Sequence, residues 1–163
     1  MGEDALVVAG RSLAQSLLAY RGRRDVAIVA ISAASLSIAQ GVADVLNVPF
    51  DIFLVRAVRV PGHHIAIAGA VARGAYVPNG KTMRDRSISL MAFVDAAKAE
   101  EDAIVELEAS YRSGRGPVAL TGVTVILVDD GASSADDLVT AITALRRHWI
   151  NEVLVVAPVE RKR

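Results

Sequence analysis

The sequence predicts an α/β fold in a single domain, with a central parallel sheet of about five strands flanked by helices. The first observation is composition: 53% of the 163 residues are hydrophobic but only 4% are aromatic, so Ala, Val, Ile and Leu must build the core. That composition suits Val- and Ile-rich parallel strands covered by Ala-rich helices. The second observation is that short apolar runs alternate along the chain with segments of helical periodicity.

The expected strands are continuous apolar runs rather than alternating ones, which is typical of strands buried on both faces. The main ones are "DVAIVAI" (25–31), "FDIFLVRAV" (50–58), "VTVILVDD" (123–130) and "NEVLVVAPV" (151–159). Two shorter strands, at 65–71 and 74–79, are expected after a turn at Pro61-Gly62. Strands separated by helices predict right-handed crossovers and a mostly parallel sheet.

Apolar residues at helical spacing predict helices between these strands. Their expected ranges are 11–22, 36–47, 89–111 and 136–147. In the long third helix, "KAEEDAIVELE" is expected to face solvent. The polar, basic segment "GKTMRDRS" (80–87) is predicted to be a mobile loop and residues 160–163 a solvated tail, within one domain covering 1–163.

Charge and residue usage argue against several classes of function. The 18 acidic and 18 basic residues give a formal net charge of zero, so no nucleic-acid partner is expected. The chain has no cysteine, hence no disulfide and no thiolate nucleophile. The start "MGEDALVVAG" lacks the pattern of a signal peptide, and no apolar span is long enough for a bilayer. We therefore expect a cytoplasmic protein with no membrane partner.

One stretch points to a family. "VILVDDGASSADDLVTAITALR" (125–146) resembles the phosphoribosyl pyrophosphate binding motif of type I phosphoribosyltransferases. The stretches "RSLAQSLLAYRGRRDVAIVAI", "FDIFLVRAVRVPGHHIAIAGAVA" and "EASYRSGRGPVALTGVTVILVDDG" resemble one bacterial branch of that family. The resemblance runs from about Arg11 to Val159 and implies a phosphoribosyltransferase-like, Rossmann-like domain.

The resemblance assigns roles to the loop after the strand at 123–130. Asp129 and Asp130 match the acidic pair that hydrogen-bonds the ribose hydroxyls, and they would be the Mg²⁺ ligands if a metal is bound. Ser133 and Ser134 would contact the 5′-phosphate at the helix N-terminus. Asp137 stands where the family has a threonine. No metal ligand can be assigned beyond the two aspartates.

Asp137 is the serious departure from the family pattern. A carboxylate and a phosphate about 5 Å apart repel by roughly 3 kcal/mol at an effective dielectric constant near 20. Aspartate near a helix start is, however, a good cap on its own. We therefore expect Asp136 or Asp137 to satisfy the N–H groups that the phosphate would otherwise satisfy.

The expected pyrophosphate loop departs in the same direction. The family branch has a Pro-Arg-Gly-Gly-like turn after the first strand, and here Ser32, Ala33, Ala34 and Ser35 take its place. The positive charge of the arginine is missing, and so are the glycines that let the backbone approach an anion closely. The family pattern also continues past "VLVVAPV" through another helix and strand, so the resemblance implies a shortened C-terminus.

Two functions remain open. In one, the chain is an active Mg²⁺-dependent phosphoribosyltransferase that uses phosphoribosyl pyrophosphate and a nucleobase-like acceptor, and Lys81, Arg84 or Arg86 belong to the loop that closes over the reaction. In the other, it is a degenerate member, a pseudoenzyme that needs no cofactor and acts as a binding, regulatory or assembly module. Two altered anion loops have a shared cause only under the second hypothesis, which we favour. The long apolar helix and the family habit also predict a homo-oligomer, a dimer or larger, and leave room for a protein partner.

Overall fold

The computed structural model describes residues 2–63 and 66–158. The chain divides into two compact units. Unit 1 comprises Met1–Phe53, Arg115–Ser133 and His148–Arg163, and unit 2 comprises Leu54–Gly114 and Ser134–Arg147. The predicted α/β class is confirmed, whereas the division into two units was not predicted.

Unit 1 contains the parallel sheet. Its strands are β1 (Val26–Ala30), β2 (Phe50–Ile52), β6 (Thr124–Val128) and β7 (Glu152–Val156). They pair in the order β2-β1-β6-β7, every pair parallel. Every residue of β1 and β6 is buried, as their continuous apolar runs predicted. Among the described residues this sheet has four strands, close to the expected five.

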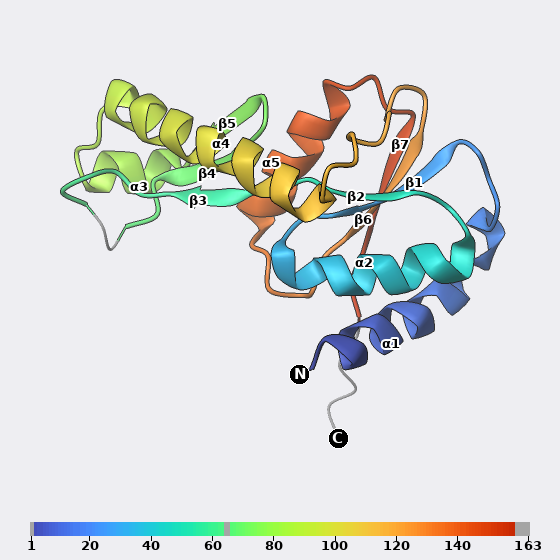
Figure 1. Ribbon diagram of the computed structural model, residues 1–163. Helices are drawn as coiled ribbons and strands as arrows, with labels where there is room; N and C mark the ends of the chain where they lie inside the picture. The colour runs from blue at the N-terminus through green and yellow to red at the C-terminus, as the bar shows by residue number, and fades with distance from the viewer. Residues whose placement is uncertain (1, 64–65, 159–163) are drawn as a thin grey trace. The chain divides into compact units, whose positions relative to one another are not determined.

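The helices of unit 1 stack in two layers on that sheet. Helix α2 (Ala33–Leu46) packs against β1, and α1 (Glu3–Ala14) packs against α2 (Figure 1). The predicted helix at 11–22 is therefore the end of α1 followed by the 3-10 helix η1 (Gln15–Tyr20). Where α1 and α2 cross, a Cβ built on Gly10 would lie 2.1 Å from the Ile38 carbonyl oxygen, so only glycine permits this approach.

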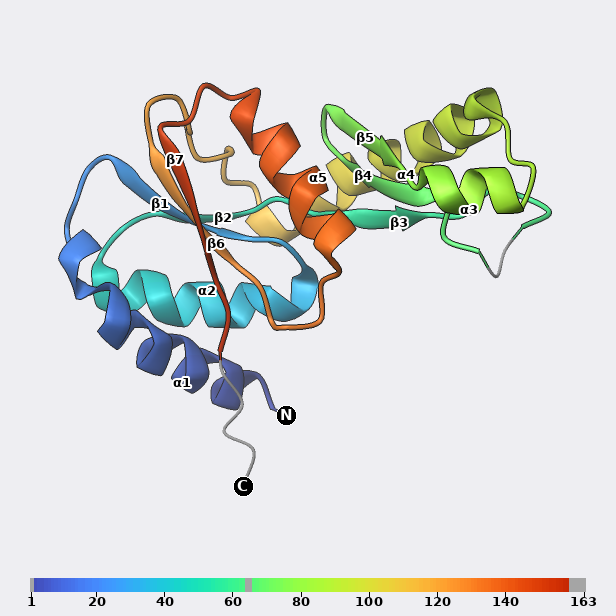
Figure 2. The same cartoon turned by 180° about the vertical axis from the view of Figure 1, so that it is seen from behind.

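Unit 2 has a different, antiparallel sheet. Strands β3 (Arg56–Val58), β4 (Gly69–Ala72) and β5 (Ala75–Pro78) pair in that order. Helices α4 (Leu90–Arg112) and α5 (Ala135–Arg146) both pack against β4 and β5; α4 is nearer the viewer in Figure 1 and α5 in Figure 2. The prediction of one strand at 50–58 was wrong, because the chain leaves the parallel sheet after Ile52 and enters the second sheet at Arg56.

The segment predicted to be a loop at 80–87 forms a short helix. Helix α3 (Gly80–Asp85) begins after Asn79, whose side chain accepts a hydrogen bond from the Thr82 N–H at 3.0 Å. An ion pair of 2.5 Å between Lys81 and Asp85 joins two residues one turn apart. This local capping was not predicted from the sequence. The mobility of the segment stays a prediction, and the predicted tail at 160–163 lies outside the described residues.

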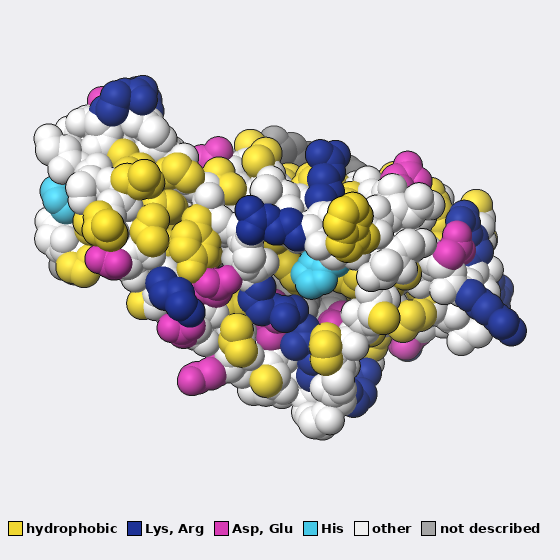
Figure 3. All heavy atoms as spheres, turned by 90° about the horizontal axis from the view of Figure 1, so that it is seen from above, with side chains coloured by type: hydrophobic (Ala, Val, Ile, Leu, Met, Phe, Trp, Pro, Cys, Tyr) yellow, Lys and Arg dark blue, Asp and Glu magenta, His cyan; other side chains and the backbone are white. Residues whose placement is uncertain are grey.

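Several large apolar side chains of unit 2 are exposed. Leu90 and Met91, at the start of α4, are 63% and 70% exposed. Figure 3 shows hydrophobic side chains gathered over this end of unit 2, with acidic and basic side chains interspersed over the rest of the face in view. In the described part of the chain, no helix has the length and apolar character needed to cross a membrane.

Candidate functional site

The two loops singled out from the sequence begin side by side in unit 1. Strands β1 and β6 are neighbours in register, with Ala30 opposite Val128. The Ile31 N–H donates to the Val128 carbonyl at 3.2 Å, so the pairing continues to the point where both strands end. The carboxyl ends of parallel strands share one edge of a sheet, which is where α/β folds bind ligands. The loop starting at Ser32 and the loop starting at Asp129 both leave from this edge.

Asp129 is turned onto its own loop. Its side chain is buried, with the residue 5% exposed, and both carboxylate oxygens accept hydrogen bonds. One accepts from the Ser133 hydroxyl at 2.6 Å and the other from the Gly131 N–H at 3.0 Å. Gly131 has φ +90°, a conformation that favours glycine and lets the chain turn back over the carboxylate.

Asp130 makes a similar but more open turn. Its carboxylate accepts the Ala132 N–H at 3.1 Å, and the residue is half-buried. Because a carboxylate oxygen has two lone pairs, these bonds leave acceptor capacity on both aspartates. Asp129 and Asp130 therefore follow β6 directly, with part of their acceptor capacity used by the loop, and their contact with ribose stays a prediction.

At the start of α5, which was predicted to hold the 5′-phosphate, two residues form reciprocal hydrogen bonds with each other. The Asp137 carboxylate accepts the Ser134 N–H at 2.9 Å, and the Ser134 hydroxyl oxygen accepts the Asp137 N–H at 3.1 Å. This reciprocal pair is a capping box. It satisfies two of the N–H groups that a helix start would otherwise offer to an anion. These residues begin the α5 segment of unit 2, whereas Ser133 ends the preceding segment of unit 1.

The start of α2, which was predicted to face pyrophosphate, also has a capping box. The Ser32 hydroxyl oxygen accepts the Ser35 N–H at 3.1 Å, and the Ser35 hydroxyl oxygen accepts the Ser32 N–H at 3.0 Å. The Ser35 hydroxyl donates in turn to the Ser32 carbonyl at 3.0 Å. Ser35 is buried, whereas Ala33 and Ala34 are exposed and bring no polar side chain.

The basic residues predicted for a closing loop belong to unit 2. Lys81, Arg84 and Arg86 all lie on or just after α3, and Lys81 is paired with Asp85. The Asp129–Ser133 stretch belongs to unit 1. The side-chain hydrogen bonds of Asp129 and Asp130 are made with Gly131, Ala132 and Ser133, within the same stretch.

The aspartates make a poor Mg²⁺ site by themselves. Within residues 2–63 and 66–158, no three His, Asp or Glu side chains gather as a metal-binding group. Magnesium is usually held by one or two carboxylates together with substrate phosphates. With both oxygens of Asp129 already accepting hydrogen bonds, a Mg²⁺ ion at this loop would depend on a bound phosphate for its other ligands.

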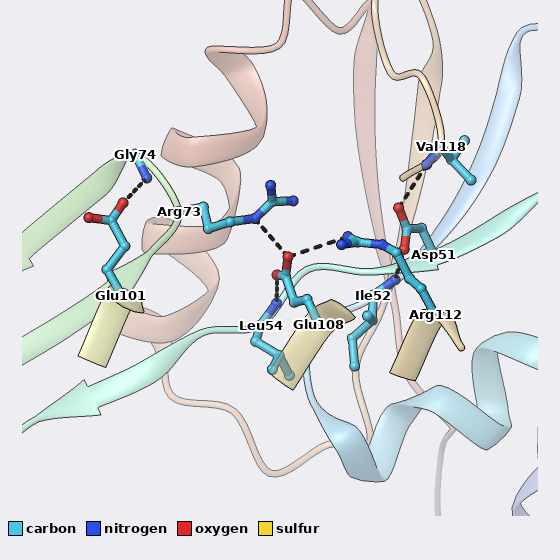
Figure 4. A network of polar contacts seen from close by, with 9 residues as sticks. All are labelled: Asp51, Ile52, Leu54, Arg73, Gly74, Glu101, Glu108, Arg112 and Val118. Carbon is cyan, nitrogen blue, oxygen red and sulfur yellow. Dashed lines mark hydrogen bonds and ion pairs between the residues drawn. The ribbon is translucent and has the colours of Figure 1, made fainter. Parts of the chain in front are cut away.

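Unit 2 contains a buried charged cluster that was not predicted from the sequence (Figure 4). Glu108 was expected to face solvent but is 0% exposed. Its carboxylate accepts the Leu54 N–H at 2.8 Å and lies 2.7 Å from Arg73 Nε and 3.3 Å from an Arg112 nitrogen. Burial raises the pKa of the Glu108 carboxyl, although the Leu54 N–H and the two arginines act in the opposite direction.

Periodicity carried a signal for this cluster. The buried residues of α4 are Phe93, Ala97, Ile104, Glu108 and Arg112. Steps of four and seven residues connect them, which is the spacing of one helical face. A glutamate and an arginine continue the apolar stripe because they satisfy each other inside the unit.

Two further carboxylates accept hydrogen bonds from backbone N–H groups of the same unit (Figure 4). In unit 1, Asp51 accepts the Val118 N–H at 2.9 Å. In unit 2, Glu101 accepts the Gly74 N–H at 2.8 Å and the Tyr76 hydroxyl at 2.5 Å. The second pair ties the turn between β4 and β5 to helix α4.

Comparison with known proteins supports the family resemblance. No family model matches the chain. Two Mycobacterium tuberculosis proteins, named "Putative phosphoribosyl transferase Rv0571c" (strain H37Rv) and "Putative phosphoribosyl transferase MT0597" (strain CDC 1551 / Oshkosh), are each 29% identical over 155 residues. The match covers 93% of this chain but 34% of each relative, so the chain spans about a third of their length.

Solved structures share the fold. TT1426 from Thermus thermophilus aligns with a TM-score of 0.67 at 22% identity, over 97% of this chain and 85% of its own. A hypoxanthine-guanine phosphoribosyltransferase from Bacillus anthracis aligns with a TM-score of 0.52 at 12% identity, over 96% and 69%. A purine phosphoribosyltransferase from Pyrococcus horikoshii gives 0.52 at 15% identity, over 92% and 68%. The chain therefore has the phosphoribosyltransferase fold, and the resemblance to type I phosphoribosyltransferases is confirmed.

Proposed function

We propose that this phosphoribosyltransferase-like protein is catalytically degenerate and acts as a binding, regulatory or assembly module. The observation that carries the proposal is the Asp137 carboxylate on the Ser134 N–H, 2.9 Å away. A phosphate at this helix start would have to displace that carboxylate or lie beside its charge. Either event opposes binding, the second by roughly 3 kcal/mol at about 5 Å.

The loop after β1 adds an independent argument. Transfer of a phosphoribosyl group depends on positioning and on stabilising the charge of the departing pyrophosphate. The Ser32–Ser35 capping box uses two N–H groups at the start of α2, and the stretch between them brings no cation. A protein that binds no pyrophosphate needs neither the charge nor free N–H groups, so one cause accounts for both loops.

The alternative is an active Mg²⁺-dependent phosphoribosyltransferase with a nucleobase-like acceptor. The observation that favours it is the Asp129-Asp130 pair directly after β6, the position of the family's ribose-binding residues, with Ser133 hydrogen-bonded to Asp129. In that case Asp129 and Asp130 hold the ribose, Ser133 and Ser134 hold the phosphate, and a bound phosphate completes the ligands of the metal.

If the protein is degenerate, proposals about its cofactor, partners and cellular compartment follow. A module of this kind requires no cofactor and works through contacts with other protein surfaces, as a homo-oligomer or with a protein partner. The absence of cysteine fits the reducing environment of the cytoplasm, which we propose as the compartment.

Calorimetric titration with phosphoribosyl pyrophosphate in magnesium buffer tests the proposal. We expect no heat of binding and no thermal stabilisation at millimolar ligand. The informative variant is Asp137→Thr, which removes the carboxylate and restores the family's residue type, and Asp136→Thr is its matched control in the same helical turn. Micromolar binding by the unaltered protein would overturn the proposal and favour the alternative, an active phosphoribosyltransferase.

A further inference from the structure

The sequence contains one Asn-Gly pair, Asn79-Gly80, where β5 ends and α3 begins. In such a pair the backbone nitrogen of the glycine can attack the side-chain amide of the asparagine, because glycine has no side chain to hinder the approach. The two other asparagines of the chain, Asn47 and Asn151, are followed by valine and glutamate. The sequence therefore favours this reaction at position 79.

Both groups that would react are accessible in unit 2. Gly80 is exposed and Asn79 is half-buried. The Gly80 N–H, at the first position of α3, donates to no acceptor in the described part of the chain, as is usual at a helix start. Beyond its chain neighbours and the backbone of α3, the nearest atom to a Cβ built on Gly80 is the flexible end of Arg84, at 3.3 Å. This side of the chain is therefore open.

The folded helix opposes the reaction through the cap. The Asn79 side-chain oxygen accepts the Thr82 N–H at 3.0 Å, and the Asn79 carbonyl accepts the Met83 N–H at 3.0 Å. Asn79 has ψ 93°, and a five-membered ring between its side chain and the Gly80 nitrogen forms only after rotation about the Asn79 Cα–C bond. That rotation breaks both hydrogen bonds, so α3 has to open first.

Opening of α3 disturbs little packing. The helix has six residues and none of them is buried. A helix of this length is not stable by itself, and segments with few buried apolar contacts open at much lower cost than the whole domain. The ion pair of Lys81 with Asp85 lies at the surface, where such pairs contribute little. The Asn-Gly pair is therefore released by a local fluctuation.

We propose that Asn79 is a site of spontaneous deamidation through a succinimide. The Gly80 nitrogen, after losing its proton, forms a bond to Cγ of Asn79, the bond from Cγ to the side-chain nitrogen breaks, and that nitrogen leaves as ammonia. Water then opens the ring. Addition of water at Cγ gives aspartate, and addition at the former backbone carbonyl gives isoaspartate, in which the chain runs through Cγ. Water is the only co-reactant.

The two products affect α3 differently. Aspartate keeps an acceptor for the Thr82 N–H and is as good an N-cap as asparagine. Isoaspartate adds a methylene to the main chain and draws Cγ into the backbone, so the cap is lost. Either product adds a negative charge beside Lys81, in the segment that also carries Arg84 and Arg86. Deamidation therefore lowers the positive charge of this segment, and the isoaspartyl form also weakens the helix.

The test is incubation of the full chain at mildly alkaline pH, followed by peptide mapping with mass spectrometry. The peptide that contains Asn79 should gain the mass that separates an acid from its amide, and should split into aspartyl and isoaspartyl forms on chromatography. Conversion should be slower at mildly acidic pH, because the Gly80 nitrogen attacks after losing its proton. Asn47 and Asn151 are internal controls in the same digest and should remain amides.

A synthetic peptide of residues 76–83 gives the rate of the reaction without the fold. The protein should convert more slowly than the peptide, and urea below the unfolding transition should reduce the difference, because it opens α3. Gly80→Ala should slow the conversion severalfold in both, since its Cβ hinders the nitrogen while meeting only the flexible end of Arg84. Gly116→Ala, at an open position, is the matched control and should convert at the rate of the unaltered protein.

Three results would overturn the proposal. In the first, Asn79 stays an amide in the protein while the peptide converts completely. In the second, Asn47 and Asn151 convert as fast as Asn79. In the third, Gly80→Ala converts as fast as the unaltered protein, which would exclude the succinimide. Because none of these readouts involves phosphate, the result is independent of the proposed degeneracy.

Discussion

Ser134 and Asp137 satisfy each other at the start of α5. The Asp137 carboxylate accepts the Ser134 N–H at 2.9 Å, and the Ser134 hydroxyl oxygen accepts the Asp137 N–H at 3.1 Å. This is the helix start at which the family resemblance implies a 5′-phosphate. The side chains of Ser134 and Asp137 therefore accept hydrogen bonds from backbone N–H groups that would otherwise be available to bind an anion.

Replacing Asp137 should weaken the helix. We expect Asp137→Ala to lower the free energy of unfolding by about 1 kcal/mol, because it removes the hydrogen bond to the Ser134 N–H and with it one half of the capping box. Asp136→Ala is the matched control, since Asp136 has the same charge in the same turn but its side chain takes no part in the capping box. Urea denaturation measures both. Equal losses from the two variants would contradict a capping role for Asp137.

The buried carboxylate of Glu108 should be sensitive to a loss of charge. Glu108→Gln can still accept the Leu54 N–H, but it removes the negative charge beside Arg73 and Arg112. We expect a loss of about 3 kcal/mol in the free energy of unfolding, because removing one partner from a buried ion pair is costly. Glu106→Gln, exposed on the same helix, should change stability little. A small loss at position 108 would show that the cluster contributes no net stability.

Replacing either of two helical glycines, Gly10 or Gly41, by alanine should destabilise the protein, although alanine is normally the better helix former. Alanine is favoured over glycine inside a helix by about 1 kcal/mol. A Cβ at Gly10 would nevertheless lie 2.1 Å from the Ile38 carbonyl oxygen, and a Cβ at Gly41 would lie 2.2 Å from that of Val7. We expect each alanine variant to lower the thermal midpoint, with a loss of roughly 2 kcal/mol or more from overpacking. Gly116→Ala, with no atom within 4 Å of the new Cβ, is the control; an unchanged midpoint for Gly10→Ala would contradict the close crossing of α1 and α2.

The Tyr76 hydroxyl should ionise at a higher pH than an ordinary tyrosine. Burial, and then the hydrogen bond to Glu101, raise the pKa of Tyr76 to about 12. A raised pKa favours the protonated form in the folded state, so its stabilising effect is present below the ordinary value of 10.0 and is lost as the pH rises toward about 12. Ultraviolet titration of tyrosinate should show one late component that Tyr76→Phe removes.

The partner of Tyr76 supplies a second variant for that titration. Glu101→Gln should move the late component to lower pH, because it removes the carboxylate whose charge opposes ionisation of Tyr76. Glu106→Gln should leave it in place. A late component that is unchanged in Glu101→Gln would show that burial alone sets the pKa.

Much of the fold followed from the pattern of apolar residues. The runs at 25–31 and 123–130 became the two central strands, because aliphatic residues without polar interruption are stable only when both faces are buried. Residue type also predicted the state of the α5 start. Aspartate near a helix N-terminus favours capping, and Asp137 completes the capping box whose N-cap is Ser134.

The failures of prediction occurred where local pattern and long-range packing conflict. The apolar run at 50–58 has no internal stop signal, yet its two halves belong to different sheets because β2 pairs with β1 while β3 pairs with β4. Glu108 has the composition of a solvent-facing residue. It is buried because Leu54, Arg73 and Arg112, distant from one another along the chain, supply its partners.

The sequence by itself determined the α/β class, the two buried central strands and the chemistry of both strand-to-helix loops, because these depend on residue type and short-range spacing. Only the tertiary structure decided the division into two units, the partners of Glu108 and the glycine contact of α1 with α2. Each of these depends on which surfaces meet after the chain has folded, and contacts between distant segments leave little trace in local periodicity.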